Sequence, residues 1–469
     1  MMRLSILMSL VVLSLGSLSF AAEETLDYGR FGKLTLYRET SQPNHVVLFI
    51  SGDGGWNLGV IDMAKSLAGL DALVIGIDIT HYLGELARSA DKCSYPASDF
   101  EFLSKYIQKK LGFERYRTPV LVGYSSGATL VYALLAQAPP NTFRGAISMG
   151  FCPDLSLNKP FCTGHGLKSE PTVKEYGYKF LPTRGLVNPW IAFQGTIDQV
   201  CDASMVESYV KQVNSAEVVM LPKVGHGFSV QKNWLPQFRE SFKRLVREEK
   251  SSSDHSDLNA EISDLPLVEV PAQEAPTDLL AVIISGDGGW ASLDRDIGSF
   301  LAAKGVPVVG LNSLEYFWTA RSPDVAGKDL ERIIRHYLTV WKCQRVLLIG
   351  YSLGADVMPF MAGRLSEDLK QQVAAVALLG PGKTAKFEFH LRDWLGGDSQ
   401  EGLPIAQELP KMRGMNVVCL YGEEEQDSLC RQQVAGGLKI KALPLGGGHH
   451  FHGEYEKLAD LLFAEISGH

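Results

Sequence analysis

The chain has 469 residues, which is enough for two domains of ordinary size. Hydrophobic residues make up 45% of it and charged residues 21%, a composition that is typical of a globular protein and excludes a disordered chain. The formal net charge of −8 argues against a nucleic-acid-binding surface, but it does not exclude an enzyme that works at a membrane.

The first 21 residues are typical of a secretory signal peptide. A basic start at Arg3 precedes an apolar run over residues 4–15, and the small residues Ser19 and Ala21 stand where a signal peptidase reads the chain. A retained membrane anchor is the alternative, although the run is short for a spanning helix. No cysteine stands at the predicted cleavage point, which argues against a lipoprotein. We therefore expect an exported, periplasmic protein.

Seven cysteines fit an oxidising compartment. Because seven is odd, at least one of them is free or pairs with another chain. Cys419 and Cys430 flank one strand-to-loop segment and form an expected pair, and two among Cys152, Cys162 and Cys201 are candidates for another. No C-x-x-C motif and no cluster of cysteine and histidine with zinc spacing occurs, so we expect no metal site.

An internal repeat divides the chain. The hexapeptide Ser-Gly-Asp-Gly-Gly-Trp stands at residues 51–56 and again at 285–290. Such an identity is hard to ascribe to chance, and it predicts one structural unit that is used twice. We place the first unit at residues 22–247 and the second at 279–469. Residues 248–278 between them are polar and then rich in proline, which is typical of a linker or of an extended segment on a surface.

Strands and helices alternate in the same order in both units. In the first unit the patterns predict strand 46–50, helix 60–67, strand 72–77, helix 97–111, and strands 119–122, 145–149, 190–195 and 218–221. In the second they predict strand 281–284, helix 293–303, strand 306–311, helix 326–341, strand 346–349, helix 355–363, and strands 373–379 and 417–422. This alternation predicts the α/β fold class, with a mostly parallel sheet flanked by helices in each unit.

A strand, a sharp turn and a helix surround Ser352. The apolar residues 346–349 are followed by Gly-Tyr-Ser-Leu-Gly at 350–354 and then by a helical pattern. This is the G-x-S-x-G elbow, which presents a serine hydroxyl at the edge of a sheet. The same motif surrounds Ser125 at residues 123–127. A lone G-x-S-x-G occurs by chance, but two elbows in one chain indicate nucleophilic serines.

A serine nucleophile needs a histidine base and a carboxylate that orients the histidine. In hydrolases with this elbow, the acid and then the histidine follow the serine along the chain. In the first unit, Asp198 follows strand 190–195 and His226 follows strand 218–221. Ser125, Asp198 and His226 therefore form a complete candidate triad and a candidate second site.

The acid of the second unit has two candidates. Strand 417–422 is followed by an acidic run, and register with the first unit favours Glu425. Asp427 stays open as well, because its carboxylate is shorter and lies close to Cys430 in the sequence.

The histidine of the second unit is also ambiguous. Residues 446–452 read Gly-Gly-Gly-His-His-Phe-His. Alignment of the Gly-His and Phe positions with the first unit favours His449, and His450 is the alternative. We expect His452 at the surface.

The two glycine-rich repeat loops follow strands whose ends supply oxyanion donors in hydrolases. Glycine-rich backbone can bring an N–H group within reach of a developing negative oxygen. We expect the N–H groups of Asp287 and Leu353 to do so in the second unit, and those of Asp53 and Ser126 in the first. The alternative is a tight turn under a buried tryptophan. A phosphate-binding loop is not expected, because no Lys-Ser/Thr pair follows the glycines.

Three carboxylates of the second unit are candidates for binding a substrate ammonium group. They are Glu315, Asp356 and Asp287. The ordinary interpretation of Asp356, one helical turn after Ser352, is a first-turn acid favoured by the helix dipole. The aromatic residues 316–318 are typical of core or of a rim over a cleft.

These motifs together resemble the VirJ/AcvB family of bacterial virulence proteins. The likeness rests on residues 285–290, 316–318, 350–359 and 447–451, and the two-unit layout is similar to the longer AcvB type. It implies two α/β-hydrolase-like units, a periplasmic location and the nucleophile Ser352. It further implies a hydrolase that removes lysine or alanine from aminoacyl-phosphatidylglycerol, in peripheral contact with the outer face of the inner membrane and without a cofactor.

The first unit matches less of the family pattern, because it has Ser126 and Thr129 where the second has Leu353 and Asp356. Whether Ser125 also reacts therefore stays open. Other functions stay open too: a general lipase or carboxylesterase, a peptidase on the same fold, and a non-catalytic interaction protein linked to secretion. Two nearly complete triads argue against the last of these. We expect no nucleic-acid partner, and the sequence does not indicate a protein partner.

Overall fold

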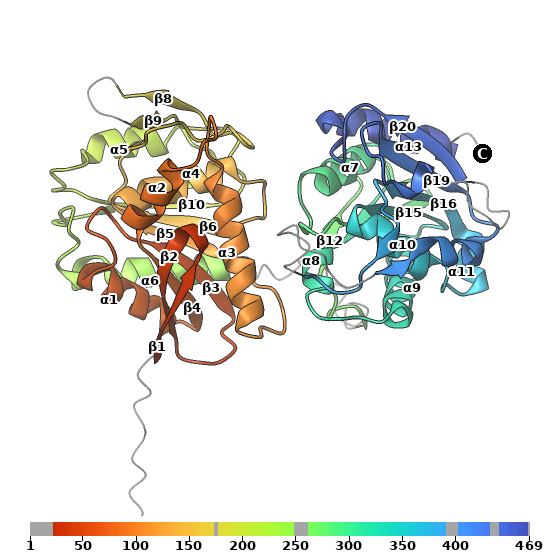
Figure 1. Ribbon diagram of the computed structural model, residues 1–469, viewed down its shortest axis with the longest axis horizontal. Helices are drawn as coiled ribbons and strands as arrows, with labels where there is room; N and C mark the ends of the chain where they lie inside the picture. Colours follow the sequence, from red (N-terminus) through yellow and green to blue (C-terminus); the bar gives the residue numbers. More distant parts are fainter. Residues whose placement is uncertain (1–21, 173–176, 248–260, 391–401, 432–439, 468–469) are drawn as a thin grey trace, which may run out of the picture.

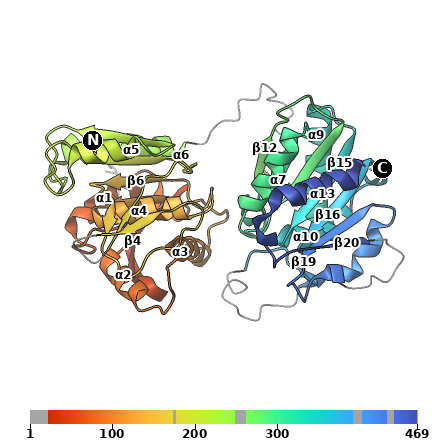
Figure 2. The same ribbon diagram turned by 90° about the horizontal axis from the view of Figure 1, so that it is seen from above.

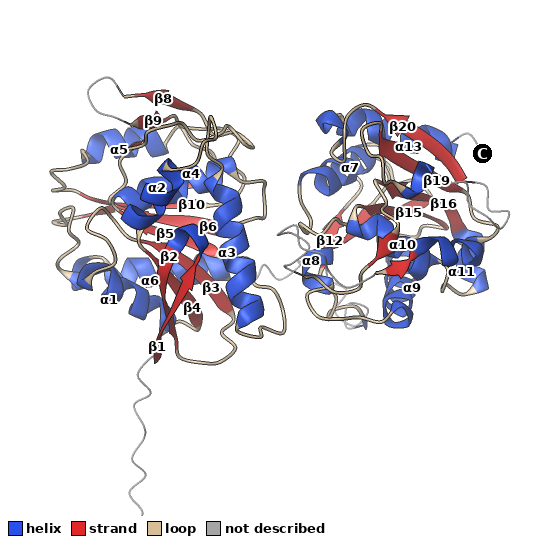
Figure 3. Cartoon of the chain, in the orientation of Figure 1, coloured by secondary structure: helices blue, strands red, loops and turns tan. Residues whose placement is uncertain are grey.

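The computed structural model describes residues 22–172, 177–247, 261–390, 402–431 and 440–467. The predicted signal peptide lies outside the described residues. The chain forms two α/β units, each built on a mostly parallel sheet with helices on both faces (Figures 1 and 3). The predicted fold class of two tandem units is thereby confirmed.

The first unit contains an eight-stranded sheet in the order β1-β2-β4-β3-β5-β6-β10-β11. Its strands are β1 (Ala22–Tyr28), β2 (Gly32–Arg38), β3 (His45–Ile50), β4 (Ala72–Ile77), β5 (Val120–Tyr124), β6 (Gly145–Met149), β10 (Trp190–Gly195) and β11 (Ala216–Leu221). The strands from β4 to β11 pair in parallel, whereas β2 is antiparallel to both β4 and β1. The carboxyl ends of β3, β5, β6, β10 and β11 therefore meet at one edge of the sheet.

The second unit repeats this sheet with seven strands in the order β12-β14-β13-β15-β16-β19-β20. They are β12 (Leu267–Val270), β13 (Leu279–Ile284), β14 (Val308–Leu311), β15 (Arg345–Tyr351), β16 (Val373–Leu379), β19 (Val417–Gly422) and β20 (Ile440–Leu445). The strand predicted at 306–311 begins only at Val308. Pro307 precedes it and has no N–H group to donate to a ladder.

The second half of the predicted linker is part of the second unit. Residues 267–270 form β12, which pairs antiparallel with β14. Beyond it, the N–H groups of Gln273 and Thr277 donate to the carbonyls of Ala302 and Gly305. Of the two interpretations of residues 248–278, the extended segment on a surface describes this part, because its backbone completes the edge of the sheet. Residues 248–260 lie outside the described part of the chain.

Helices cover both faces of each sheet. In the first unit they are α1 (Leu58–Ala68), α2 (Ile79–Ala87), α3 (Pro96–Lys110), α4 (Ser126–Gln137), α5 (Ala203–Val210) and α6 (Leu235–Val246). In the second they are α7 (Ser292–Ala303), α8 (Ser313–Tyr316), α9 (Pro323–Val340), α10 (Leu353–Ala362), α11 (Glu367–Gln372) and α13 (Tyr455–Ser467). Helices α1 and α6 share one hydrophobic core with the first sheet, and α7 and α13 occupy the same face of the second (Figure 2).

Short strands lie outside the two main sheets. Three of them, β7 (Asp154–Leu155), β8 (Ser169–Pro171) and β9 (Tyr178–Phe180), form a small sheet after β6. The pair β17 (Thr384–Ala385) and β18 (Leu403–Pro404) follows β16 in the second unit. Both small sheets therefore stand in the long connection after the strand that neighbours the serine elbow.

Three disulfides stabilise the described chain, and they are Cys93–Cys162, Cys152–Cys201 and Cys419–Cys430. The expected pair between Cys419 and Cys430 is confirmed. Among the three other candidates, Cys152 pairs with Cys201, whereas Cys162 pairs with Cys93, which the sequence did not indicate. Cys343 is a free, buried thiol. No helix among the described residues is long and apolar enough to cross a membrane.

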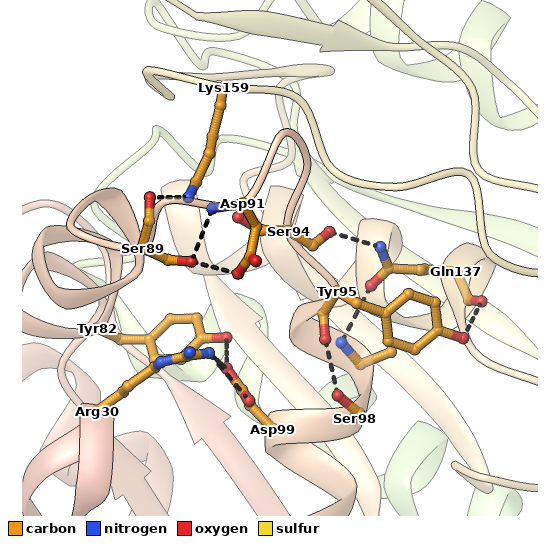
Figure 4. Close-up of polar contacts among 11 residues, drawn as sticks. Arg30, Tyr82, Ser89, Asp91, Ser94, Tyr95, Ser98, Asp99, Gln137 and Lys159 are labelled. Carbon is orange, nitrogen blue, oxygen red and sulfur yellow. Dashed lines mark hydrogen bonds and ion pairs between the residues drawn. The ribbon is translucent and has the colours of Figure 1, made fainter.

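A buried glutamine joins helix α4 to the segment that precedes α3. The Gln137 side chain donates to the carbonyl of Ser94 (Figure 4). It also accepts the N–H of Ala97 at 3.0 Å and donates to the carbonyl of Cys162. Its own carbonyl accepts the hydroxyl of Tyr95 at 3.1 Å. Each of these groups is removed from water and needs a partner. The network therefore fixes the helix that begins directly after Ser125.

We predict that Gln137→Leu lowers the free energy of unfolding of the N-terminal unit by about 1–3 kcal/mol, because it leaves the N–H of Ala97 and the carbonyl of Cys162 without the glutamine, while the carbonyl of Ser94 keeps the N–H of Cys162 at 2.8 Å. Urea denaturation measures this change. The exposed Gln212, which donates only to the carbonyl of Ser208, supplies the matched control. Gln212→Leu should change the free energy by less than about 0.5 kcal/mol. Equal effects of the two substitutions would contradict the role given to Gln137.

Candidate active site

Both elbow serines have the strained backbone that presents a nucleophile. Ser125 has φ 55° and ψ −121°, and Ser352 has φ 53° and ψ −117°. Such angles are rare for residues with a Cβ atom, and they persist only where the surrounding structure imposes them. The N–H of Ser125 donates to the carbonyl of Met149, and that of Ser352 donates to the carbonyl of Leu379, both at 2.9 Å. Each serine is thereby tied to the end of the neighbouring strand.

Close backbone contacts explain the second glycine of each elbow. A Cβ atom on Gly127 would lie 2.4 Å from the carbonyl oxygen of Ile50, and one on Gly354 would lie 2.0 Å from that of Ile284. Both distances are far shorter than van der Waals contact. Helices α4 and α10 therefore pack directly against the ends of β3 and β13 only because these positions are glycine.

The predicted triad of the first unit is assembled. Nε2 of His226 lies 2.9 Å from Oγ of Ser125, and Nδ1 lies 2.9 Å from Oδ2 of Asp198. The other carboxylate oxygen accepts the N–H groups of Val200 and Cys201. Burial acts to raise the pKa of Asp198, but the hydrogen bonds from Cys201, His226 and Val200 hold this pKa below its ordinary value. The acid therefore stays ionised at neutral pH and orients the imidazole.

The second unit brings Glu425 and His449 together. Nδ1 of His449 lies 2.6 Å from Oε1 of Glu425, and the other carboxylate oxygen accepts the N–H of Gly422 at 2.7 Å. Glu425 thus makes the same kind of contacts as Asp198 in the first unit, with one bond to the imidazole and one to backbone. The longer side chain is accommodated at the same position after the strand.

The two imidazoles occupy equivalent places. A Cβ atom on Gly380 would lie 2.9 Å from the His449 ring, and one on Gly150 would lie 3.1 Å from the His226 ring. Both glycines directly follow the strand whose last carbonyl binds the N–H of the elbow serine. No hydrogen bond between Ser352 and His449 is found in the described part of the second unit. Catalytic hydrogen bonds are often long before substrate binds, so this difference does not exclude His449 as the base.

The alternative residues of the second unit have other partners. Nδ1 of His450 lies 2.9 Å from the hydroxyl of Tyr351, and burial followed by the charge of His449 lowers the pKa of His450. Asp427 forms an ion pair with Lys383 at 2.8 Å, and its side chain is 94% exposed. His452 is exposed, as expected. His449, rather than His450, therefore contacts Glu425, although the two imidazole rings lie with centroids 5.9 Å apart.

The two glycine-rich repeat loops lie against the serines. A Cβ atom on Gly52 would lie 3.0 Å from Cβ of Ser125, and one on Gly286 would lie 3.6 Å from Cβ of Ser352. These loops therefore bring backbone N–H groups next to each nucleophile. Asp287 and Leu353 line one cavity with Ser352, and the oxyanion roles expected for their N–H groups and for those of Asp53 and Ser126 stay predictions.

The tryptophan of each loop fills a gap on the neighbouring strand. A Cβ atom on Gly76 would lie 2.2 Å from the Trp56 ring, and one on Gly310 would lie 2.1 Å from the Trp290 ring. The alternative interpretation of the loop, a tight turn with a packed tryptophan, thus describes its last residue. The packed tryptophan fixes the end of the loop, whereas the beginning of the loop lies against the serine.

A cavity of about 330 Å³ opens at Ser352. Asp287, Leu353 and Asp356 line it together with the segment 382–390, which carries Lys383 and Lys386. No motif pointed to this segment. Burial raises the pKa of Asp356 to about 8, opposed by the hydrogen bond from the N–H of Gly382 at 2.7 Å and assisted by the charge of Asp287. Two of the three candidate ammonium ligands therefore face the same cavity as the nucleophile.

The third candidate, Glu315, lies elsewhere. It accepts a hydrogen bond from the Asn312 side chain at 2.9 Å and lines two cavities that Ser352 does not reach. Burial raises the pKa of Glu315, and the charges of Arg117 and Arg144 from the first unit oppose this effect. The prediction of an ammonium site at Glu315 therefore does not fit its position, which faces the first unit.

The aromatic residues before α9 pack between the units. Trp318 is buried, its ring stacks on Phe389 with centroids 5.6 Å apart, and its Nε1 donates to the carbonyl of Phe113 at 2.7 Å. Tyr116 lies against the same ring, with centroids 5.2 Å apart. Because Phe389 also lines the cavity at Ser352, the contact between the units supports one wall of that cavity.

One cluster has the geometry of a metal site but not its chemistry. The potential ligand atoms of Asp198, Cys201 and His226 lie within 4.8 Å of one another. The sulfur of Cys201 is bonded to Cys152, so it offers no thiolate. Asp198 and His226 are already engaged with each other and with Ser125.

The raised pKa of Asp356 predicts a pH-dependent stability. An unfolded aspartate titrates near 3.9, so between about pH 4 and 8 unfolding releases the proton that the folded state holds. The stability of the C-terminal unit should therefore fall as pH rises through this window, and Asp356→Asn should remove that contribution. The free energy of unfolding of Asp356→Asn minus that of the wild type should therefore increase by up to about 1.4 kcal/mol per pH unit between pH 5 and 7.

Urea denaturation of the wild type and of Asp356→Asn at pH 5, 6 and 7 measures this difference. Asp427→Asn is the control, because Lys383 lowers the pKa of Asp427 and moves its titration below this range. A constant difference between Asp356→Asn and wild type across the three pH values would show that the folded carboxyl titrates normally.

No curated protein sequence matches the chain. Solved structures similar to it include the carboxylesterase CesB from Bacillus subtilis, with 17% identity, coverage of 49% of this chain and 93% of that protein, and a TM-score of 0.33. An α/β serine hydrolase without a lid from Xanthomonas campestris has 19% identity, coverage of 50% and 97%, and a TM-score of 0.32. The esterase domain of a Rhodothermus marinus protein has 15% identity, coverage of 48% and 99%, and a TM-score of 0.33.

A sequence profile of the bacterial virulence protein (VirJ) family matches residues 44–151 and 278–469, together more than half of the chain. The first segment contains the elbow at Ser125, and the second contains Ser352, Glu425 and His449. With two parallel sheets, two nucleophile elbows and this match, the chain has an α/β-hydrolase fold and belongs to the bacterial virulence protein (VirJ) family.

Proposed function

We propose that the C-terminal unit is a serine hydrolase that cleaves the aminoacyl ester of aminoacyl-phosphatidylglycerol and releases lysine or alanine. The observation that carries this proposal is the cavity at Ser352, where Asp356 and Asp287 stand beside the nucleophile. An aminoacyl ester differs from other lipid esters by the ammonium group next to its carbonyl. A largely buried carboxyl within the same cavity is suited to bind that group.

The residues of the site support acyl transfer through a covalent intermediate. Ser352 attacks the ester carbonyl while His449, oriented by Glu425, takes its proton. The N–H groups of Asp287 and Leu353 stabilise the oxyanion. His449 then gives the proton to the departing glycerol oxygen of phosphatidylglycerol. Water attacks the aminoacyl-serine with His449 as base, and the free amino acid leaves.

The raised pKa of Asp356 is consistent with a site that binds a cationic group. With a pKa of about 8, most of this carboxyl is neutral at pH 7 before substrate binds. A positive charge nearby lowers the pKa of a carboxyl, so an ammonium group entering the cavity would be paired with an ionised Asp356. The attraction is stronger there than at the surface because the Asp356 carboxyl is largely buried.

The proposal includes a periplasmic location and contact with a membrane surface. Three disulfides are typical of an exported protein. Release of the amino acid from the lipid would restore the negative charge of phosphatidylglycerol. The enzyme would therefore adjust the surface charge of the outer face of the inner membrane, with the aminoacylated phospholipid as its partner and no cofactor.

We predict that Ser352→Ala lowers the hydrolysis of alanyl- and lysyl-phosphatidylglycerol in vesicles by at least about 1,000-fold, because the nucleophile is removed. Mass spectrometry of the extracted lipids measures the remaining substrate. Ser299→Ala, on the exposed face of α7, should leave the rate unchanged. Full activity of Ser352→Ala would contradict the proposed site, and no activity of the wild type on either lipid would contradict the proposed substrate.

A second prediction tests the ammonium site. Asp356→Asn keeps the size of the side chain but cannot carry a negative charge, so kcat/KM for aminoacyl esters should fall by at least about tenfold, which corresponds to about 1.4 kcal/mol. In the Ser125→Ala background, where Ser352 is the remaining elbow serine, the residual hydrolysis of an uncharged ester should not fall. Equal losses for charged and uncharged esters would instead favour a general carboxylesterase. Asp460→Asn, at an exposed position on α13, is the control and should change neither rate.

A further inference from the structure

We propose that the N-terminal unit is a second hydrolytic site, and that it takes esters of uncharged, apolar acyl groups. This activity goes beyond the aminoacyl-lipid hydrolysis proposed for the C-terminal unit. It rests on three observations: an assembled triad, a missing carboxyl beside the nucleophile, and an apolar rim where the other unit has an acidic one.

The triad of the N-terminal unit is ready for catalysis. Ser125, His226 and Asp198 are joined by two contacts of 2.9 Å. The serine has the strained backbone of the elbow and lies against the glycine-rich loop that carries the N–H of Asp53. A unit that served only as a scaffold would have no need of a strained serine aligned with an oriented imidazole.

The acyl side of this site lacks the buried carboxyl of its counterpart. Thr129 stands four residues after Ser125, where Asp356 stands after Ser352. Thr129 is 1% exposed, and its hydroxyl donates to the carbonyl of Cys152 at 2.6 Å. The hydroxyl of Thr129 therefore has its hydrogen-bond partner within the protein, and the side chain carries no charge that could bind a ligand.

The disulfide closes the same region. Cys152 is the second residue after Gly150, just as Gly382, whose N–H binds Asp356, is the second residue after Gly380. The bond from Cys152 to Cys201 joins this segment to the loop of the catalytic acid. The remaining carboxyl near the nucleophile, on Asp53, is exposed to solvent. An ammonium group at this site would therefore lose hydration without gaining a buried partner.

The loops that carry the acid and the base of the N-terminal site also carry three exposed aliphatic side chains. Ile197 and Val200 flank the catalytic Asp198 and are 60% and 66% exposed. Val230, four residues after His226, is 48% exposed. The loops that carry them follow β10 and β11, at the edge of the sheet where Ser125 stands, and the N–H of Ile197 donates to the carbonyl of Val224 in the neighbouring loop.

The corresponding loop of the C-terminal unit is acidic, and its Asp427 pairs with Lys383 of the cavity wall at 2.8 Å. When Asp198 is aligned with Glu425, Ile197 corresponds to Glu424. In the same alignment, Val200 corresponds to Asp427. Both acidic residues are exposed. Two neighbouring positions thus change from apolar to negative while the catalytic acid between them is kept. Exposed apolar side chains gain free energy when an apolar acyl group covers them, at about 25 cal/mol per Å².

The proposed reaction needs no component beyond ester and water. Ser125 forms a new ester with the acyl group while His226 carries its proton to the departing alcohol. Water then attacks the acyl-serine, and the carboxylic acid is released together with the regenerated hydroxyl.

A pair of matched substrates tests whether the two sites hydrolyse different esters. Ethyl 2-methylpropanoate and alanine ethyl ester differ only by a methyl group in place of the ammonium group. In the full chain, Ser125→Ala should lower kcat/KM for the methylpropanoate ester by at least about 100-fold and change that for the alanine ester by less than twofold. Ser208→Ala, on the exposed side of α5, is the control. Thermal unfolding verifies that each variant is folded.

Unchanged hydrolysis of the methylpropanoate ester by Ser125→Ala would overturn the proposal, and so would an equal loss of both activities. The test with Ser125→Ala does not depend on the function proposed for the C-terminal site. If that proposed function were wrong, hydrolysis of the alanine ester would survive Ser352→Ala. The double variant Ile197→Glu/Val200→Asp tests the rim without touching the triad side chains. It should lower turnover of the methylpropanoate ester at least about tenfold and leave the alanine ester unchanged. No effect on the methylpropanoate ester would overturn the assignment of the substrate class.

Discussion

One backbone contact organises each half of this protein. The second elbow glycine, Gly127 or Gly354, lies so close to the carbonyl at the end of β3 or β13 that no side chain fits between them. This approach forces the preceding serine into its strained conformation. The glycine-rich repeat loop begins at the next residue after the same strand. Its second residue, Gly52 or Gly286, therefore lies beside the elbow serine. Nucleophile and expected oxyanion donors are therefore positioned by the same contact, which explains why the motifs occur together in both units.

Around this shared frame the two units differ in charge. The C-terminal cavity contains Asp356 with a raised pKa, and the loop after β19 is acidic, whereas the N-terminal site has Thr129 and exposed aliphatic residues at the matching positions. Substitutions beside a triad change which acyl group is bound without moving the atoms that react. Duplication of the unit thus offers a simple physical route to two hydrolytic specificities in one chain, and it explains why the catalytic residues are alike while their surroundings are not.

The sequence predicted the central strands well, because buried parallel strands are short apolar runs that end at turn residues. Strands β4, β6, β10, β16 and β19 have the bounds expected from the sequence. Edge elements were harder: β12 was taken for linker because its proline-flanked segment has no long apolar run. The preference for Glu425 and His449 came from register between the units, and the structure places these two side chains in contact, although their roles remain predictions. The pairing of Cys93 with Cys162 and the cavity wall at 382–390 depend on tertiary contacts that no local pattern encodes.

The central claim is that each unit carries an activated serine. The most direct measurement is the intact mass of the full chain after reaction with a fluorophosphonate, followed by mapping of the modified peptides. The account predicts two adducts per chain, one on Ser125 and one on Ser352, with one adduct lost in each single serine-to-alanine variant. A chain that takes up no adduct, or whose adducts lie on other residues, would contradict it.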